Sequence, residues 1–120
     1  MMMQNYPKPI KRMLREYLGK AYECELQREL AKLDKSFAEW RSGQLSSGEL
    51  SERIHHYETG PSRELFKRYN DGPVDMNVAY AIVVGILDQA EVSPELLEAI
   101  SRPISFYRHM QEQNELREPD

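Results

Sequence analysis

The fold is decided by residues 9–41, PIKRMLREYLGKAYECELQRELAKLDKSFAEWR. Apolar side chains recur along this stretch in steps of three and four residues, which is the spacing of one face of an α-helix. These side chains are Ile10, Leu14, Tyr17, Ala21, Tyr22, Leu26, Leu30, Leu33, Phe37 and Trp40. Oppositely charged residues one turn apart fill the other faces. The sequence therefore predicts one long amphipathic helix, with Pro9 in its first turn.

Gly19 leaves an alternative open inside this helix. The apolar stripe changes phase between Ala21 and Tyr22, and Gly19 lies just before the change. Because glycine weakens a helix interior, the pattern is compatible with a kink, or with a break that divides the stretch into two helices.

Two shorter helices are predicted to follow. Ser46 and Glu49 have the spacing of a capping box, in which each side chain satisfies the other's backbone N–H, so a second helix is expected to begin there. Gly60 accepts the left-handed conformation of a helix end and Pro61 comes next, so this helix is expected to stop at Gly60. A third helix is expected over about 62–69.

The most apolar segment of the chain, 76–89, is predicted to be the central buried helix. Asp75 stands immediately before it and is the residue expected to cap it. The β-branched side chains of this segment also permit a strand. We favour the helix, because a lone strand would have no partner in a chain patterned for helices.

The rest of the chain contributes one or two more helices. Ser93 and Pro94 have the chemistry of a cap and a first helical turn, and Pro103 marks either a break or a restart capped by Ser101. Residues 112–120 are polar and are expected to form a disordered tail. The sequence thus predicts an all-α fold: a compact bundle of five or six helices in a single domain, residues 1–111, with one long N-terminal amphipathic helix.

Composition favours an intracellular protein. The chain has 120 residues and a single cysteine, Cys24, so it forms no internal disulfide, and its first residues lack the apolar stretch of a secretory signal. Cys24 is expected to be a small buried apolar residue. The longest apolar run, 78–87, is too short to cross a bilayer. A cytoplasmic location without a membrane span is the prediction.

Charge is distributed unevenly along the chain. The net charge is -4, yet residues 1–20 carry five basic side chains against Glu16 alone, a balance of +4. Four of these side chains share one face of the predicted helix: Lys8, Lys11, Arg12 and Arg15. We call them the basic row. Such a row suits a phosphate backbone, anionic lipid headgroups or an acidic protein surface. It is equally compatible with a solvated face or with neutralisation of the acidic tail, and the pI near 5.4 argues against a dedicated nucleic-acid binder.

A second basic cluster, Arg63, Lys67 and Arg68, follows Gly60 and Pro61. The backbone N–H groups at a helix start favour anions, so this cluster is a second candidate contact with an anion or an acidic partner. A tight connection between two helices is the simpler interpretation, and we favour it.

The chain offers little for catalysis. Glu52 and His55 form one Glu-x-x-His unit, with His56 beside it, but a carboxylate-bridged metal site needs a second unit and Phe106 occupies the matching position before His109. We favour a solvated helix face here. The sequence contains no glycine-rich phosphate loop, no His-Glu-x-x-His and no nucleophile elbow. No catalytic residue, metal ligand or cofactor is assigned.

The predicted first helix is longer than the domain that contains it. At about 1.5 Å per residue it spans roughly 50 Å, whereas a compact domain of this length has a diameter of about 35 Å. Its apolar stripe nonetheless continues through Leu33, Phe37 and Trp40, and such side chains need cover in water. A second copy of the chain is the simplest cover, so we expect these three residues to mediate self-association. A helix that breaks at Gly19 and folds back on itself is the alternative.

These observations favour a non-catalytic regulatory or adaptor module that acts through protein–protein contacts as a homodimer. The main alternative is a nucleic-acid-associated regulator that uses the basic row. A small helical enzyme or metal-binding protein is a lesser alternative.

Overall fold

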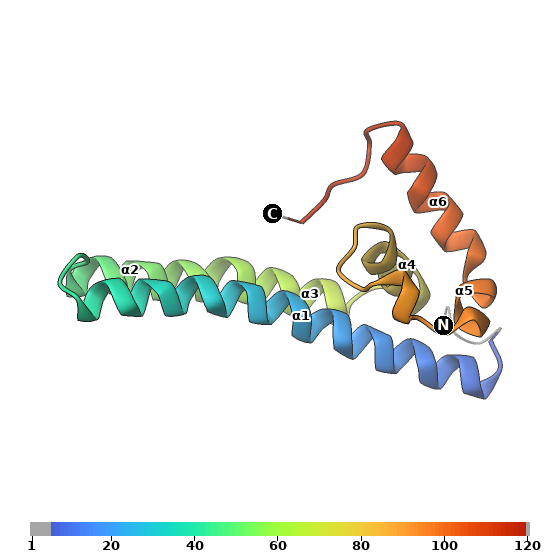
Figure 1. Cartoon of the computed structure of the whole chain (residues 1–120), viewed down its shortest axis with the longest axis horizontal. Helices are drawn as coiled ribbons and strands as arrows, with labels where there is room; N and C mark the ends of the chain where they lie inside the picture. Colours follow the sequence, from blue (N-terminus) through green and yellow to red (C-terminus); the bar gives the residue numbers. More distant parts are fainter. Residues whose placement is uncertain (1–5, 120) are drawn as a thin grey trace. The chain divides into compact units, whose positions relative to one another are not determined.

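The structure, a computed structural model, describes residues 6–119, and over this range it contains helices and no strand (Figure 1). The α-helices are α1 (Lys8–Arg41), α2 (Ser47–Tyr57), α3 (Arg63–Asn70), α4 (Val74–Val83), α5 (Pro94–Ala99) and α6 (Ser101–Glu112). A π-helical turn, η2, covers Glu58–Ser62, and a 3-10 turn, η3, covers Gln89–Glu91. The predicted all-α fold with one long N-terminal helix is confirmed. Within the described range, no helix has the length and apolar content needed to cross a membrane.

Helix α1 continues through Gly19 without a break. The alternative of two helices, and with it the folding back of the first helix on itself, is therefore wrong. The physical reason is that one glycine inside a helix costs only about 0.5–1 kcal/mol relative to alanine, which the packing of a long amphipathic helix outweighs.

The chain divides into two compact units, and the boundary falls inside α1. One unit, which we call the hairpin unit, is Tyr22–Asn70. The other, which we call the terminal unit, combines Met1–Ala21 with Asp71–Asp120. Each is described separately below.

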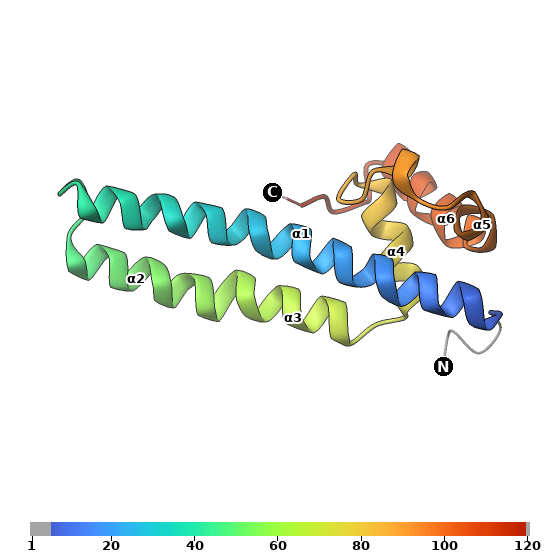
Figure 2. The ribbon, with the colours of Figure 1, turned by 60° about the horizontal axis from the view of Figure 1, so that its bottom comes forward.

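In the hairpin unit, the second half of α1 runs antiparallel to α2 and α3 (Figure 2). The reversal occurs at Gly43, whose φ of 85° lies in the left-handed region, and the backbone N–H of Gly43 donates to the carbonyl of Trp40. The predicted capping box then opens α2. The hydroxyl of Ser46 accepts from the N–H of Glu49 at 3.1 Å, and the carboxylate of Glu49 accepts from the N–H of Ser46 at 3.0 Å.

The predicted end of the second helix at Gly60 is wrong. Positive φ values among the described glycines occur at Gly43 and Gly85, and the chain passes through Gly60 and Pro61 in the π-helical turn before it continues as α3. Proline ordinarily clashes with the carbonyl four residues earlier. A wider π turn relieves this clash, because it adds one residue to the turn, so α2, η2 and α3 form one nearly continuous helical arm.

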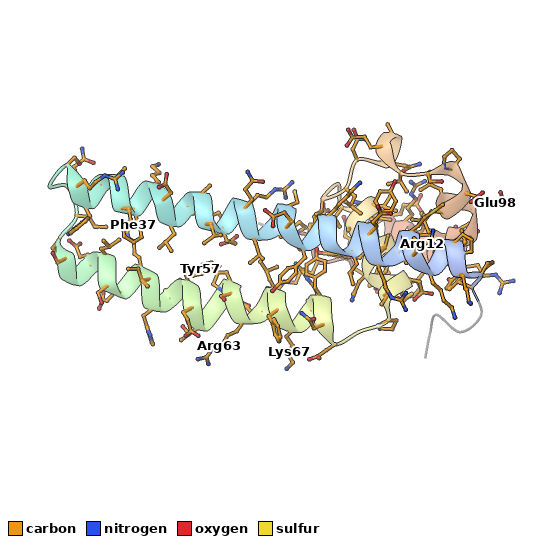
Figure 3. The ribbon with its side chains drawn as sticks, turned by 90° about the horizontal axis from the view of Figure 1, so that it is seen from below. Arg12, Phe37, Tyr57, Arg63, Lys67 and Glu98 are labelled. Atoms are coloured by element: carbon orange, nitrogen blue, oxygen red, sulfur yellow. The ribbon has the colours of Figure 1, made fainter. Side chains whose placement is uncertain are left out.

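The core of the hairpin lies along the line where its two arms meet. Leu50 and Leu65 are buried there, and Phe37 and Tyr57 point into the space between α1 and α2 (Figure 3). Leu45, in the turn, is buried at the closed end of the hairpin.

In the terminal unit, α4 is the central helix and packs against α6. Among the described residues, the largest fully buried side chains belong to this unit: Leu14, Val78, Leu96 and Ile100. The strand alternative for this segment is wrong. The helix is also shorter than the predicted 76–89, because Gly85 adopts a left-handed φ of 83° that ends it. Ile86 and Leu87 follow that turn and remain buried.

Asp75 does not cap α4 as predicted. Pro73 is the N-cap residue and Asp75 lies inside the first turn, where it is 5% exposed. Its side chain accepts a hydrogen bond from the hydroxyl of Tyr6 at 2.8 Å and another from the N–H of Met76 at 2.8 Å. Burial and this hydrogen bond to Asp75 raise the pKa of Tyr6 to about 12.

The last two helices follow each other directly. Pro94 occupies the first turn of α5 after Ser93, as predicted. The chain restarts as α6 at Ser101, with Pro103 in its first turn, and Ile100 rather than Ser101 is the N-cap residue. After α6, the carbonyl of Arg117 accepts a hydrogen bond from the hydroxyl of Tyr80 at 2.7 Å.

Candidate interaction surface

One edge of the hairpin unit is closed by ion pairs. The guanidinium of Arg53 donates to the hydroxyl of Ser36 at 3.0 Å and to the carboxylate of Glu39 at 3.0 Å. Nearer the open end of the hairpin, Arg68 forms an ion pair with Glu25. We call this edge the ion-paired edge. It joins α1 to α2 at one level and α1 to α3 at another.

In the ion pair between Glu25 and Arg68, the carboxylate of Glu25 is the buried partner. The side chain of Glu25 is 7% exposed, and it accepts hydrogen bonds from Arg68 and from the hydroxyl of Tyr69. The ring of Tyr69 stacks on Tyr22 with 5.1 Å between ring centroids. A buried carboxylate is stable only when it is paired and hydrogen-bonded, so Arg68 is a structural partner of Glu25.

The opposite edge carries exposed apolar side chains from both arms. Leu30 is 47% exposed, Ile54 is 39% exposed and Phe66 is 61% exposed. Successive residues of an α-helix are rotated by about 100°, so Ile54 points about 100° away from its neighbour Arg53. By the same rule Phe66 lies about 160° from Arg68 and Leu30 about 140° from Glu25. We call the edge formed by Leu30, Ile54 and Phe66 the open edge.

The residues predicted to mediate self-association lie partly inside the hairpin. Leu33 and Phe37 are half-buried between its arms. Trp40 is 41% exposed; its Nε1 donates to the hydroxyl of Ser47 at 3.0 Å, and its ring meets that of Phe37 edge-on. Their part in self-association stays a prediction. The open edge was missed because a helical stripe does not say which of its members face the other arm.

The second basic cluster is divided by the structure. Arg63 and Lys67 point away from α1 (Figure 3), and Arg63 forms an exposed ion pair with Glu58 at 3.2 Å. Arg68 instead pairs with Glu25. The chain is helical on both sides of this cluster, so the helix start that was expected to supply free N–H groups does not exist here. Contact of this cluster with an anion or an acidic partner stays a prediction.

The basic row lies on α1 in the terminal unit. Lys8, Arg12 and Arg15 are exposed and Lys11 is half-buried. Within residues 6–119, none of these four forms a salt bridge. The row is therefore an accessible cationic surface over the described part of the chain.

The groups considered for metal binding or catalysis do not converge. Glu52, His55 and His56 are all exposed on α2. Among the described residues, no three His, Cys, Asp or Glu side chains gather in a way that could hold a metal ion. Cys24 is half-buried rather than buried.

A shallow hollow in the terminal unit is lined by Tyr17, Lys20, Leu87, Asp88, Glu91 and Val92. Two of its polar side chains, Tyr17 and Lys20, have partners within the hollow. The hydroxyl of Tyr17 donates to the carbonyl of Glu91 at 3.1 Å, and the ammonium of Lys20 lies 4.9 Å from the centre of the Tyr17 ring. The hollow therefore presents no group that is prepared for chemistry.

The open edge is the candidate functional site, because it exposes three large apolar side chains, Leu30 on α1, Ile54 on α2 and Phe66 on α3. Nothing in its composition is suited to acid–base or nucleophilic chemistry, whereas apolar side chains on a helical surface are suited to packing against another protein. No protein-family model, no curated protein and no solved structure matches this chain.

Proposed function

We propose that this protein is a non-catalytic interaction module that acts through protein–protein contacts, and that its hairpin unit self-associates to form a homodimer. The observation that carries the proposal is the open edge. Exposed apolar patches on a helical surface commonly mark protein interaction sites. Burying these side chains is favourable by roughly 1 kcal/mol for each one that loses about half of its exposed area, and a two-fold dimer buries each of them twice.

A second hairpin is the simplest partner because of how helices are stabilised. Most of the stability of a helix in a protein comes from the packing of its apolar face, and in an isolated hairpin each arm has only one neighbour. Two hairpins that share their open edges give each arm a second neighbour. The result is a four-helix bundle, a common and stable arrangement.

The test is the mass of the protein in solution. We expect light scattering to give twice the chain mass of 14.1 kDa for the natural protein. Leu30→Glu and Phe66→Glu are each expected to give the mass of one chain while the helical circular-dichroism signal is retained, because each places a charge in the buried contact. Ala31→Glu is the matched control. Ala31 is exposed on α1, about 100° around the helix from Leu30, so this variant should keep the dimer mass.

A second candidate function, a nucleic-acid-associated regulator, is favoured by the accessibility of the basic row. A row of four cations along a helix suits a phosphate backbone, and such binding weakens steeply with salt. Replacing Lys8, Lys11, Arg12 and Arg15 with glutamine is expected to abolish any binding to a fluorescent DNA or RNA duplex at low salt. Replacing Lys32 and Lys35 with glutamine is the control, because both lie in the hairpin unit and outside the basic row. Equal binding by both sets of variants, or no binding by the natural protein, would reject this candidate.

A further inference from the structure

On α1, the residues on the same side as Leu30 begin with an acidic side chain, Glu23, and end with a basic one, Arg41. Glu23, Leu30 and Phe37 are separated by steps of seven, and Arg41 follows Leu30 by eleven. Steps of seven and eleven return to nearly the same side of an α-helix, within about 20°. Glu23 and Arg41 therefore stand on the same line as Leu30, the first toward the open end of the hairpin and the second beside its turn.

Both charges are available to a partner. Glu23 and Arg41 are exposed, and within residues 6–119 neither forms a salt bridge. They are eighteen residues apart on one helix, which is about 27 Å at 1.5 Å per residue. They are thus too far apart to pair within one chain.

The apolar residues between these charges are symmetric about the same level of α1. Leu26, Leu30, Leu33 and Phe37 are centred between residues 31 and 32, and the midpoint of Glu23 and Arg41 is residue 32. A two-fold axis that crosses α1 at right angles near residue 32 would therefore exchange Leu26 with Phe37, Leu30 with Leu33, and Glu23 with Arg41.

The second arm of the hairpin is centred on nearly the same level. Ser36 is level with Arg53 and Glu25 with Arg68, because these pairs are in contact. Position 32 of α1 lies between these two levels, and linear interpolation of residue numbers along the two arms places it opposite about residue 58 of the second arm. The midpoint of Ile54 and Phe66 is residue 60. The apolar residues of the two arms, half-buried and exposed together, are thus arranged about nearly one level.

We infer that the partner of the open edge is a second copy of this chain in antiparallel orientation, in which Glu23 of each copy meets Arg41 of the other. The inference rests on the proposed function and adds the orientation of the partner. An antiparallel pair brings opposite charges together at both ends of the contact. A parallel pair would instead place Glu23 against Glu23 and Arg41 against Arg41, and like charges at an interface select against that arrangement.

Asp34 is the remaining charge near this line. It is exposed and lies about 40° from Leu30, at the rim of the open edge. In the antiparallel pair the two copies of Asp34 are offset by about four residues, or roughly 6 Å along the axis, whereas in a parallel pair they would be directly opposite. This residue therefore favours the same orientation.

The experiment is a charge exchange measured by the dissociation constant of the dimer at low salt. Glu23→Arg and Arg41→Glu each turn two attractive contacts into repulsive ones, so each variant alone is expected to dimerise roughly 10- to 30-fold more weakly. A 1:1 mixture of the two variants is expected to form a heterodimer about as tight as the natural dimer. The double variant, Glu23→Arg with Arg41→Glu, is expected to recover the natural dissociation constant.

Two controls separate this orientation from the dimer itself. Lys35→Glu reverses a charge at an exposed position about 140° from Leu30, so it should leave dimerisation unchanged. A parallel dimer would already place like charges together, so neither single variant would be weakened relative to the natural chain, and the 1:1 mixture, in which opposite charges would meet at both positions, would associate more tightly than the natural chain. Unchanged dimerisation of both single variants, or a mixture tighter than the natural dimer, overturns the antiparallel orientation and leaves the homodimer standing. A natural protein that is monomeric overturns both.

Discussion

The carboxylate of Glu25, on α1, is held by the guanidinium of Arg68, forty-three residues later on α3. The two side chains are unequally exposed, 7% for Glu25 and 36% for Arg68. The pair fixes the ion-paired edge of the hairpin and so determines which side chains are left on the opposite edge. The candidate interaction surface is therefore a consequence of this contact as well as of the apolar stripe.

Removing Arg68 should destabilise the hairpin. Arg68→Met leaves the buried carboxylate of Glu25 without its cation, and we expect a loss of about 2–3 kcal/mol, the lower end for a buried pair because the guanidinium is partly in water. Urea denaturation followed by circular dichroism measures it. Lys67→Met, at the exposed neighbouring position, should cost less than about 0.5 kcal/mol. Equal effects of the two substitutions would show that the ion pair is not structural.

Two glycines of the hairpin unit, Gly60 and Gly43, should respond to alanine in opposite directions. Gly60 does not have a positive φ, and a Cβ there would meet nothing within 4 Å, so Gly60→Ala is expected to stabilise the protein by about 0.4–1 kcal/mol. Gly43 has a φ of 85°, so Gly43→Ala is expected to destabilise it by about 1–2 kcal/mol. Melting temperatures of the two variants decide this. Destabilisation by Gly60→Ala would support a helix that ends at Gly60.

The capping box should contribute measurably to α2. Ser46→Ala removes the acceptor for the N–H of Glu49, and we expect a loss of about 1 kcal/mol. Ser51→Ala, at an exposed position inside α2, is the control and should have little effect or a slight stabilising one. Chemical denaturation measures both. A Ser46→Ala protein as stable as the Ser51→Ala protein would be inconsistent with the cap.

Stability should fall at high pH through Tyr6. Its pKa is raised from 10.0 to about 12 in the folded protein, by burial first and then by the hydrogen bond to Asp75. The neutral phenol is therefore the form that folding favours. Its contribution is fully present below pH 10 and is lost as the pH rises from 10 toward 12.

The phenol absorbance of the natural protein minus that of Tyr6→Phe isolates this titration. We expect a midpoint near 12 for the folded chain. The pKa of Tyr107 is also raised, by burial and by the charge of Asp75. A parallel comparison of the natural protein with Tyr107→Phe identifies the part of the titration that belongs to Tyr107. A difference curve for Tyr6 centred at the ordinary tyrosine value would contradict the contact with Asp75.

Local signals in the sequence predict much of the fold. The spacing of apolar residues over 9–41 is repeated through nine helical turns or so, and the Ser46–Glu49 pair has one plain structural meaning, so α1 and the start of α2 are predicted well. Gly60 and Pro61 are ambiguous, because the pair suits either a helix end or a π-helical turn. Asp75 is ambiguous as well, because an aspartate suits either an N-cap or a position inside the first helical turn. Tertiary packing decides between those outcomes, and it is not visible in a local pattern.

The open edge needs the structure for a different reason. Leu30, Ile54 and Phe66 belong to apolar stripes of the sequence, but so do Leu33, which is half-buried, and Leu50, which is buried. The two sets separate only when Arg53 and Arg68 are seen to reach α1 from the opposite edge. That is a contact between residues distant in sequence, so no stretch of one helix contains it.

We propose that a second copy of the chain covers the open edge. Sedimentation equilibrium of the natural, unmodified protein over a wide range of concentrations tests this most directly. We expect a single reversible monomer–dimer equilibrium, with the dimer mass approached as concentration rises. The mass of one chain, 14.1 kDa, at every concentration would contradict the claim.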